Sequence, residues 1–248
     1  MNTPAIDWNP RSRQSDSLEV YLLGRVDFES AVRLQERWVY EISGRRDRLG
    51  VLLLCEHPPL ITVGREGSHA DLAIDERELR SRLLTLHWMN RGGGTLVHAP
   101  GQLAAYPILP LDRLGLGLAD YRRVLEQAVI ETCGDLKVDA TRDPRRPGVF
   151  CRTGQLGWIG AAVKSWVSYH GLFLNVSPAM HLMRLVNSRD DDIPATSLAA
   201  QRTRPTSMHT VRERLIHHLV DQLGYSDWHL YSGHPLLTRT RKKVHVTA

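Results

Sequence analysis

The sequence predicts an α+β (α/β) fold, and three features of the residue pattern support this class. Short apolar or alternating segments, which are typical of strands, occur in pairs along the chain. Longer segments with apolar residues at helical spacing separate these pairs. Three further strand-like segments follow one another with only short turns between them. A doubly wound sheet would alternate strand and helix, so antiparallel strands with packed helices fit the pattern better.

The first half of the chain contains two predicted helices. The segment 28–42 is predicted to form an amphipathic helix because its apolar residues recur near one face. Asp75, with Glu78 three residues later, indicates the start of a second helix that extends to Leu84. The predicted strands of this half cover residues 18–23, 51–55, 60–63, 86–89 and 103–109.

The second half is predicted to contain an antiparallel run of strands between two helices. The helices cover residues 120–132 and 207–223. The strands cover residues 149–152, 155–163 and 166–176, with turns at Thr153-Gly154 and Lys164-Ser165. These elements predict a flexible N-terminal tail over residues 1–17, one domain over residues 18–230, and a basic C-terminal tail over residues 231–248.

Length and composition predict a soluble globular protein of one domain, or at most one domain with a small appendage. The chain has 248 residues, of which 42% are apolar and 24% charged, and no apolar run is long enough to span a membrane. The three cysteines show no disulfide framework, which favours the cytoplasm. Cys55 and His57 are too few for a zinc site, so we expect no metal and no cofactor.

The net charge of +5 indicates acidic partners, among which nucleic acid and an acidic carrier protein are the two main classes. Much of the positive charge lies in residues 142–146 and in the tail residues 239–243. Only 6% of the residues are aromatic, and no basic strand carries the stacking side chains that single-stranded nucleic acid requires. We therefore expect no nucleic acid and no membrane as partner.

The densest motif is RGGGTLVHAPGQ over residues 91–102, followed by Tyr106-Pro107. Consecutive glycines let a backbone approach a ligand closely, and their amides can bind an anion or a carbonyl oxygen. Arg91 offers a planar set of donors for a carboxylate or phosphate. His98 is a candidate acid, base or hydrogen-bond donor.

This motif and several others in register with it resemble the lipoyl(octanoyl) transferase family of the biotin/lipoate ligase superfamily. The resemblance extends from about residue 18 to about residue 223. The other matching motifs are Glu56-His57-Pro58-Pro59, Thr62-Val63-Gly64-Arg65, Ile159-Gly160, His170-Gly171-Leu172, Leu174-Asn175 and Thr196-Ser197-Leu198.

The resemblance implies a biotin/lipoate protein ligase-like catalytic domain with mixed, largely antiparallel sheets. Members of the family take an octanoyl group from acyl carrier protein and pass it to a lysine of a lipoyl domain. The resemblance assigns three segments to the acyl pocket of this chain. The implied substrate-binding residues are Arg91, Gly92, Gly93, Gly94, His98, Trp158, Ile159, Gly160, His170, Gly171, Leu172 and Phe173.

The chain departs from the family at both catalytic positions. The family's nucleophilic cysteine precedes the Thr-Ser-Leu motif, and Ser188, or Arg189 with one residue of gap, lies at that place here. Gln155 replaces the family lysine that favours the thiolate by its positive charge. Lys164 is nine residues further along the same strand, which places it on the opposite face unless a bulge intervenes.

These substitutions leave three hypotheses. The chain could be a catalytically degenerate protein that binds an acyl group or a partner. It could be a working acyltransferase with Cys151 or Ser188 as nucleophile, assisted by His98 or His170 as base. It could be a basic interaction module, although the retained pocket motifs have no purpose there. An ATP-dependent ligase reaction would also need the lysine that Gln155 replaces.

Overall fold

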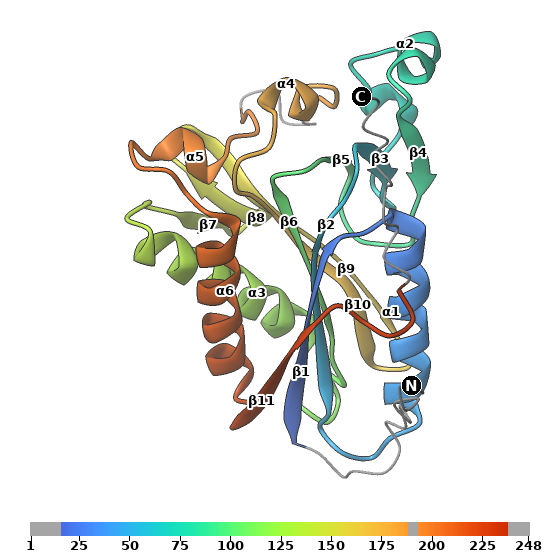
Figure 1. Ribbon diagram of the computed structural model, residues 1–248, viewed down its shortest axis with the longest axis vertical. Helices are drawn as coiled ribbons and strands as arrows, with labels where there is room; N and C mark the ends of the chain where they lie inside the picture. Colours follow the sequence, from blue (N-terminus) through green and yellow to red (C-terminus); the bar gives the residue numbers. More distant parts are fainter. Residues whose placement is uncertain (1–15, 188–192, 238–248) are drawn as a thin grey trace, which may run out of the picture.

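The computed structural model describes residues 16–187 and 193–237, and an eight-stranded sheet forms its centre (Figure 1). β11, β1 and β2 are parallel neighbours, whereas every pairing from β2 onward to β7 is antiparallel. In spatial order the strands are β11 (Asp227–Ser232), β1 (Ser17–Arg25), β2 (Gly50–Glu56), β6 (Gln102–Ile108), β10 (Val167–Asn175), β9 (Gly154–Lys164), β8 (Arg146–Cys151) and β7 (Thr141–Asp143).

A second sheet of three strands stands at one end of the first (Figure 1). Its strands, in spatial order, are β4 (Thr85–Trp88), β3 (Leu60–Val63) and β5 (Thr95–His98). β3 pairs with β4 in parallel and with β5 in antiparallel orientation. The two sheets confirm the predicted α+β class with mixed, largely antiparallel strands.

Three long helices cover the large sheet, and capping side chains mark the start of two of them, α1 (Phe28–Ser43) and α6 (Met208–Leu223). α1 begins after Asp27, whose carboxylate accepts a hydrogen bond from the Ser30 amide at 2.9 Å. α3 (Leu118–Asp135) and α6 lie on the opposite face. The short helices are α2 (Glu76–Ser81), α4 (Met180–Met183), α5 (Leu198–Gln201) and the 3-10 helix η2 (His69–Asp71).

The predicted second helix is shorter in the structure. α2 begins after Asp75 as expected, because this side chain accepts a hydrogen bond from the Glu78 amide at 2.7 Å. The helix ends at Ser81 instead of Leu84 because Leu83 adopts a left-handed conformation with φ of 54°. The chain then turns directly into β4.

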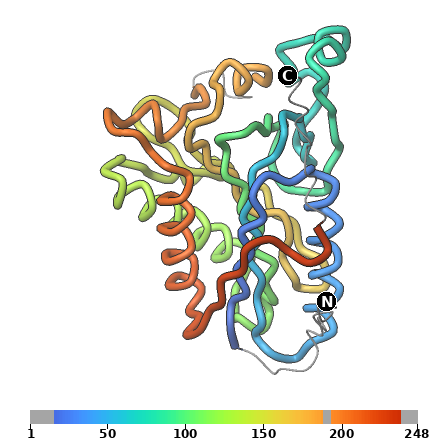
Figure 2. Tube along the Cα trace, viewed as in Figure 1, coloured from blue at the N-terminus to red at the C-terminus, as the bar shows by residue number. Residues whose placement is uncertain are grey.

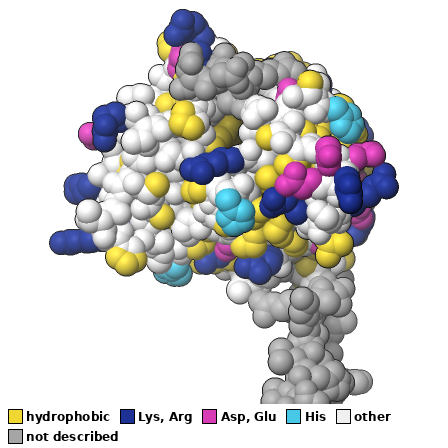
Figure 3. Space-filling model, turned by 90° about the horizontal axis from the view of Figure 1, so that it is seen from above, with side chains coloured by type: hydrophobic (Ala, Val, Ile, Leu, Met, Phe, Trp, Pro, Cys, Tyr) yellow, Lys and Arg dark blue, Asp and Glu magenta, His cyan; other side chains and the backbone are white. Residues whose placement is uncertain are grey.

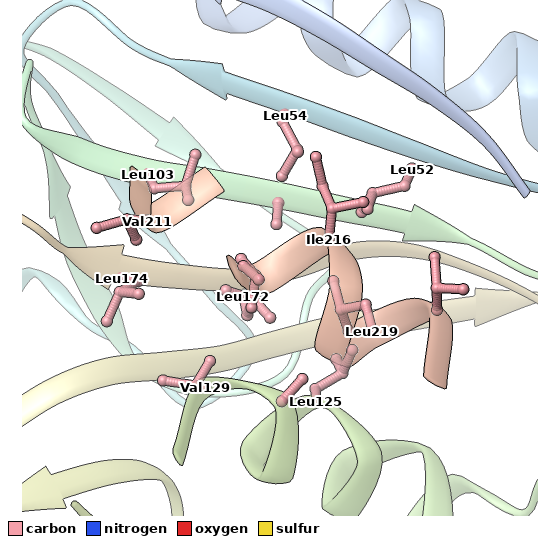
Figure 4. Close-up of a cluster of buried hydrophobic side chains, with 14 of the residues drawn as sticks. Leu52, Leu54, Leu103, Leu125, Val129, Leu172, Leu174, Val211, Ile216 and Leu219 are labelled. Carbon is pink, nitrogen blue, oxygen red and sulfur yellow. The ribbon is translucent and has the colours of Figure 1, made fainter. Parts of the chain in front are cut away.

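The large sheet is covered by apolar side chains on both faces. One cluster packs between the sheet and α3 and α6, as Figure 4 shows for Leu172, Leu174 and Leu125. The other packs against α1 and includes Phe173 and Trp38. Because neighbouring residues of a strand point to opposite faces, β10 contributes alternately to both clusters.

The C-terminal part of the described chain pairs with β1 as the edge strand β11 and then reaches α1 (Figure 2). The amide of Gly233 donates to the carbonyl of Leu22 at 2.8 Å, and the rings of Tyr21 and Tyr231 stack at 4.9 Å. His234 is buried beside them. The predicted domain end at residue 230 therefore falls inside β11, and the described fold continues to residue 237; residues 1–15 and 238–248 of the predicted tails lie outside the described part.

Candidate functional site

A cavity of about 680 Å³ opens between the two sheets. Its walls come from residues 91–94, here called the glycine loop, from β5, from β9 and from residues 183–187 and 193–195. Its apolar lining residues include Leu96, Val97, Phe150, Trp158, Ile159 and Met183. Polar and charged side chains, among them Glu66, Arg91 and Gln155, line other parts of the same cavity, so its wall is apolar only in part. An apolar stretch of wall beside polar groups is typical of sites that bind a ligand with an apolar and a polar end.

The glycine loop is fixed by backbone hydrogen bonds to residues 64–66. The amides of residues 64, 65 and 66 donate to the carbonyls of residues 94, 91 and 93, at 3.1, 3.0 and 3.2 Å. A Cβ atom on Gly64 would lie 2.3 Å from the Gly93 carbonyl oxygen, so only glycine permits this approach. Gly93 itself has φ of 79°.

Two of the loop amides are already engaged within the protein. The Gly92 amide donates to the Ala161 carbonyl of β9 at 2.9 Å, and the Gly93 amide donates to Glu66 Oε1 at 3.2 Å. The loop is therefore attached to β9, and the expected anion binding by consecutive glycine amides does not extend to these two groups. Gly160 lies under this contact, since a Cβ atom there would be 3.2 Å from Arg91 Cδ.

Arg91 is almost completely buried, with 1% of its surface exposed, and it lines the cavity. Its Nη2 donates to the Thr62 carbonyl at 3.0 Å and to Thr62 Oγ1 at 2.7 Å, and its Nη1 donates to the Gly92 carbonyl at 3.0 Å. Its Nε has no hydrogen-bond partner among the described residues. Burial lowers the pKa of Arg91 to about 10, so the side chain remains charged at neutral pH.

A chain of buried side-chain hydrogen bonds begins at Arg91. Thr62 Oγ1 accepts from Arg91 and lies 2.8 Å from His98 Nε2, and His98 Nδ1 lies 2.9 Å from Gln102 Oε1. An amide oxygen only accepts, so Nδ1 carries the proton and Nε2 accepts from the Thr62 hydroxyl.

The same chain continues across the large sheet. Gln102 Nε2 donates to Asn175 Oδ1 at 3.0 Å, and Asn175 Nδ2 donates to the Thr196 carbonyl at 3.0 Å. We call the whole series from Arg91 to Thr196 the buried polar chain. It connects four of the sequence motifs, and mutual hydrogen bonding therefore accounts for the polar residues found in them.

The predicted base residues His98 and His170 are buried and do not line the cavity. Burial lowers the pKa of His98 well below its usual value, and both of its ring nitrogens are engaged by Thr62 and Gln102. Burial lowers the pKa of His170 to about 4, with a further contribution from the charge of Arg91. Both imidazoles are therefore neutral at neutral pH.

The third predicted pocket segment, residues 170–173, packs inside the fold. A Cβ atom on Gly171 would lie 2.4 Å from the Ala105 carbonyl oxygen, so this glycine permits the close contact between β10 and β6. Leu172 and Phe173 are buried in the clusters on opposite faces of the sheet. The structure thus brings Arg91, Gly93, Gly94, Trp158 and Ile159 to the cavity, and the segment 170–173 to the layer behind it.

Gln155, at the position of the family lysine, lines the cavity at the start of β9. Its Nε2 donates to the Gly157 carbonyl at 3.0 Å and to the Pro147 carbonyl at 3.4 Å. β9 pairs with β8 through an irregularity, in which Val149 opposes Gly157 and Phe150 opposes Gln155. The extra residue of this bulge lies in β9, so side chains of β9 beyond the bulge point to the face opposite to the one expected from simple alternation.

Lys164 cannot act at the Gln155 position despite this bulge. It lies at the far end of β9 and is exposed. Nine residues at about 3.3 Å each separate the two side chains by roughly 30 Å. The Gln155 end of the cavity therefore receives no charge from Lys164.

The two candidate nucleophiles differ in what the structure describes. Ser188 and Arg189 lie outside the described residues. The described residues on either side of this gap, Asn187 and Ile193, line the cavity. Cys151 is half-buried at the end of β8, with Sγ 3.5 Å from Thr153 Oγ1. It lines a second cavity of about 720 Å³, which adjoins the first.

One polar pair in the cavity wall, Asp71 and Thr95, lies partly outside the sequence motifs and could not be predicted from them. Thr95 Oγ1 donates to Asp71 Oδ2 at 2.6 Å, and the Ser68 amide donates to the same oxygen at 2.8 Å. Asp71 thereby holds η2 against β5. Gln102, Thr62 and Asn175, in contrast, stood inside the matching motifs but had not been assigned a role.

Two further sequence expectations concern metals and membranes. The described residues contain no group of three or more His, Cys, Asp or Glu side chains placed to hold a metal ion. Within the same ranges, no helix is both long and apolar enough to cross a bilayer.

Comparison with known proteins gives a consistent family. Residues 27–220 match the lipoyl protein ligase A/B catalytic domain. The octanoyltransferase of Solibacter usitatus is 36% identical over 198 residues, covering 79% of this chain and 88% of that protein. The octanoyltransferase of Geobacter metallireducens is 36% identical over 191 residues, covering 77% and 86%.

Solved structures share the fold at low sequence identity. A bipartite lipoate protein ligase from Thermoplasma acidophilum superposes with a TM-score of 0.72 at 14% identity, covering 89% of this chain and 88% of that one. Lipoate-protein ligase A bound with ATP gives a TM-score of 0.70 at 14% identity, covering 88% and 90%. From the domain match and these relatives together, the chain belongs to the lipoyl protein ligase A/B catalytic domain family.

Proposed function

We propose that this protein binds a medium-chain acyl group in the cavity beneath the glycine loop and transfers it to a lysine of a lipoyl domain. Acyl carrier protein is the proposed donor, and the cytoplasm the proposed compartment. The cavity of about 680 Å³, with Leu96, Trp158 and Ile159 in one part of its wall, carries the proposal. The octanoyltransferase relatives support octanoyl as the acyl group.

The polar groups of the cavity suit the thioester end of such a ligand. Arg91 Nε is a buried donor on a cavity-lining residue, and buried donors left unpaired are costly. A thioester carbonyl oxygen bound there would satisfy it. The hydrocarbon tail would then lie against Leu96, Trp158 and Ile159, which line the same cavity.

The chemistry needs only an attack by the lysine amine on the acyl carbon, with release of the carrier thiol. Incubation with octanoyl-loaded carrier protein and unmodified lipoyl domain should add one octanoyl group to the lipoyl domain, as measured by mass spectrometry. Carrier binding without this mass increase would instead favour the degenerate acyl-binding protein, and absence of both would refute the proposal.

A substitution that fills the cavity tests whether the acyl group binds there. In Leu96→Trp, a half-buried cavity side chain is replaced by a larger one, and we expect octanoyl transfer to fall at least about tenfold. Transfer of a butanoyl group, which needs less room, should fall less. Leu118→Trp on the exposed side of α3 is the control and should retain full activity. Equal activity of both variants would mean that the chain binds its acyl group elsewhere.

A further inference from the structure

The cavity beneath the glycine loop has a closed end beside α4. Val97, Gln102 and Met183 line the cavity there and are buried, with 5%, 4% and 6% of their surfaces exposed. The wall formed by β8 and the turn after it contains exposed residues instead, such as Pro147 and Thr153. Figure 3 shows this side of the molecule from above, with hydrophobic and basic side chains near the middle of the face. Among the described residues, the closed end is therefore the part of the wall that limits how far an apolar ligand can extend.

The Met183 side chain separates the cavity from an apolar cluster behind it. Met183 belongs to the buried cluster that also contains Ile61, Leu79 and Leu84. These three residues do not line the cavity, whereas Met183 does. Shortening the Met183 side chain would therefore extend the cavity toward the cluster, because a packed core fills such a space only in part.

The buried polar chain fixes the position of the closed end relative to Arg91. Gln102 is a member of this chain, and its Nε2 lies 4.0 Å from Met183 Sδ. Both hydrogens of this amide are already donated, to the Val97 carbonyl at 3.1 Å and to Asn175 Oδ1 at 3.0 Å. The thioether thus packs over an amide that needs no further partner. Because Arg91 and Gln102 belong to the same series of hydrogen bonds, the distance between Arg91 and Met183 is held constant.

The distance from the glycine loop to the closed end corresponds to a medium-length acyl chain. Gly94 ends the loop, and β5 leads from Thr95 past Val97. Three residues of extended backbone between Gly94 and Val97 cover roughly 10 Å. An extended octanoyl chain is about as long as this stretch, whereas a longer chain would reach the Met183 side chain.

We propose that Met183 sets the upper limit of acyl chain length by closing the cavity at a fixed distance from Arg91. This inference rests on the proposed function, because it assumes that an acyl group binds with its carbonyl oxygen at Arg91 Nε. Octanoyl fills the space between the two residues. Decanoyl is longer than this space, so its tail must push the thioether into a cluster that is already packed, and such overpacking is costly.

Titration calorimetry with octanoyl-pantetheine and decanoyl-pantetheine measures this limit. The unmodified protein should bind the octanoyl compound at least about tenfold more tightly than the decanoyl compound. In Met183→Ala, decanoyl-pantetheine should bind at least as tightly as octanoyl-pantetheine, because the freed space can bury the additional methylene groups.

The outcomes of these titrations separate the two proposals. Equal affinities in the unmodified protein, or an unchanged preference for octanoyl in Met183→Ala, would overturn the role of Met183 and leave the proposed function intact. Failure of the unmodified protein to bind either compound would refute the proposed function itself.

A larger side chain at the same position should move the limit in the opposite direction. In Met183→Phe, the ring extends into the cavity, and hexanoyl-pantetheine should bind at least about fivefold more tightly than octanoyl-pantetheine. The unmodified protein should show the reverse order, because octanoyl buries two more methylene groups. This variant keeps an apolar side chain in the cluster, so the test does not depend on the alanine variant being folded. An unchanged preference for octanoyl in Met183→Phe would contradict the proposal.

Met180→Ala is the matched control for the alanine variant. Met180 lies on the same helix and packs against the same cluster, but it does not line the cavity. We expect this control to keep the preference of the unmodified protein for octanoyl, and urea unfolding checks that both alanine variants are folded. If Met180→Ala loses the preference as completely as Met183→Ala, loosening of the cluster determines the chain length, and the proposed limit at Met183 is wrong.

Discussion

Replacing Arg91 by methionine should abolish octanoyl binding and lower the free energy of unfolding by about 2–4 kcal/mol. Methionine fills much of the same volume but donates no hydrogen bond. The Thr62 and Gly92 carbonyls would then be buried without the donors that they have now. The glycine loop would lose its side-chain attachment, and the acyl ligand would lose the Nε donor.

Urea unfolding and calorimetric titration with octanoyl-pantetheine measure the two effects separately. Arg65→Met is the matched control, because Arg65 is exposed and, among residues 16–187 and 193–237, its side chain donates a hydrogen bond only to Asn90, at 3.2 Å. We expect the control to change the free energy of unfolding by less than about 0.5 kcal/mol. Retention of octanoyl affinity in Arg91→Met would show that Arg91 supports the fold without contributing to the acyl site.

His57 and His170 together should remove about 4 kcal/mol of stability between pH 7.5 and pH 5. Burial lowers the pKa of His57 and His170 to about 4 each, against about 6.5 in the unfolded chain. Protonation therefore favours the unfolded state. The stabilisation is complete above pH 6.5, and it is lost as the pH falls toward 4.

His170→Asn isolates one of these contributions. His170 has φ of 55°, a conformation that asparagine tolerates well. Urea unfolding of this variant at pH 7.5 and pH 5 should show a fall in the free energy of unfolding that is about 2 kcal/mol smaller than the fall in the unmodified protein. His181→Asn, at an exposed position of α4, should leave the loss unchanged. If His170→Asn keeps the full pH dependence, the acid sensitivity arises from other groups.

Sequence patterns predicted the elements whose apolar residues are regularly spaced. α1, β3 and α6 occur within one or two residues of their expected positions, and Asp27, Asp75 and Ser207 cap the helices they precede. β5 was not predicted, because it lies inside the glycine motif. The glycines before it and His98 at its end interrupt the alternation of apolar and polar residues that would indicate a strand. β11 was missed because an exposed edge strand has no apolar face to reveal it.

The candidate site was predicted only in part, for a physical reason. Motif order located the glycine loop and β9, which do form the cavity. The same resemblance placed Leu172 and Phe173 at the acyl group, but alternation along a central strand directs them into two separate cores. Residues that fix a neighbouring backbone, such as Gly171, produce the same motif signal as residues that touch a ligand.

The buried polar chain has a consequence for how the molecule unfolds. It connects β3 and β5 of the small sheet with β6 and β10 of the large sheet through side chains alone. Separating the sheets would leave several buried donors and acceptors without partners at once, and this makes partial opening at the junction costly in free energy. The three-stranded sheet therefore behaves as part of one cooperative unit with the larger one, and the mouth of the acyl cavity keeps its shape until the whole structure melts.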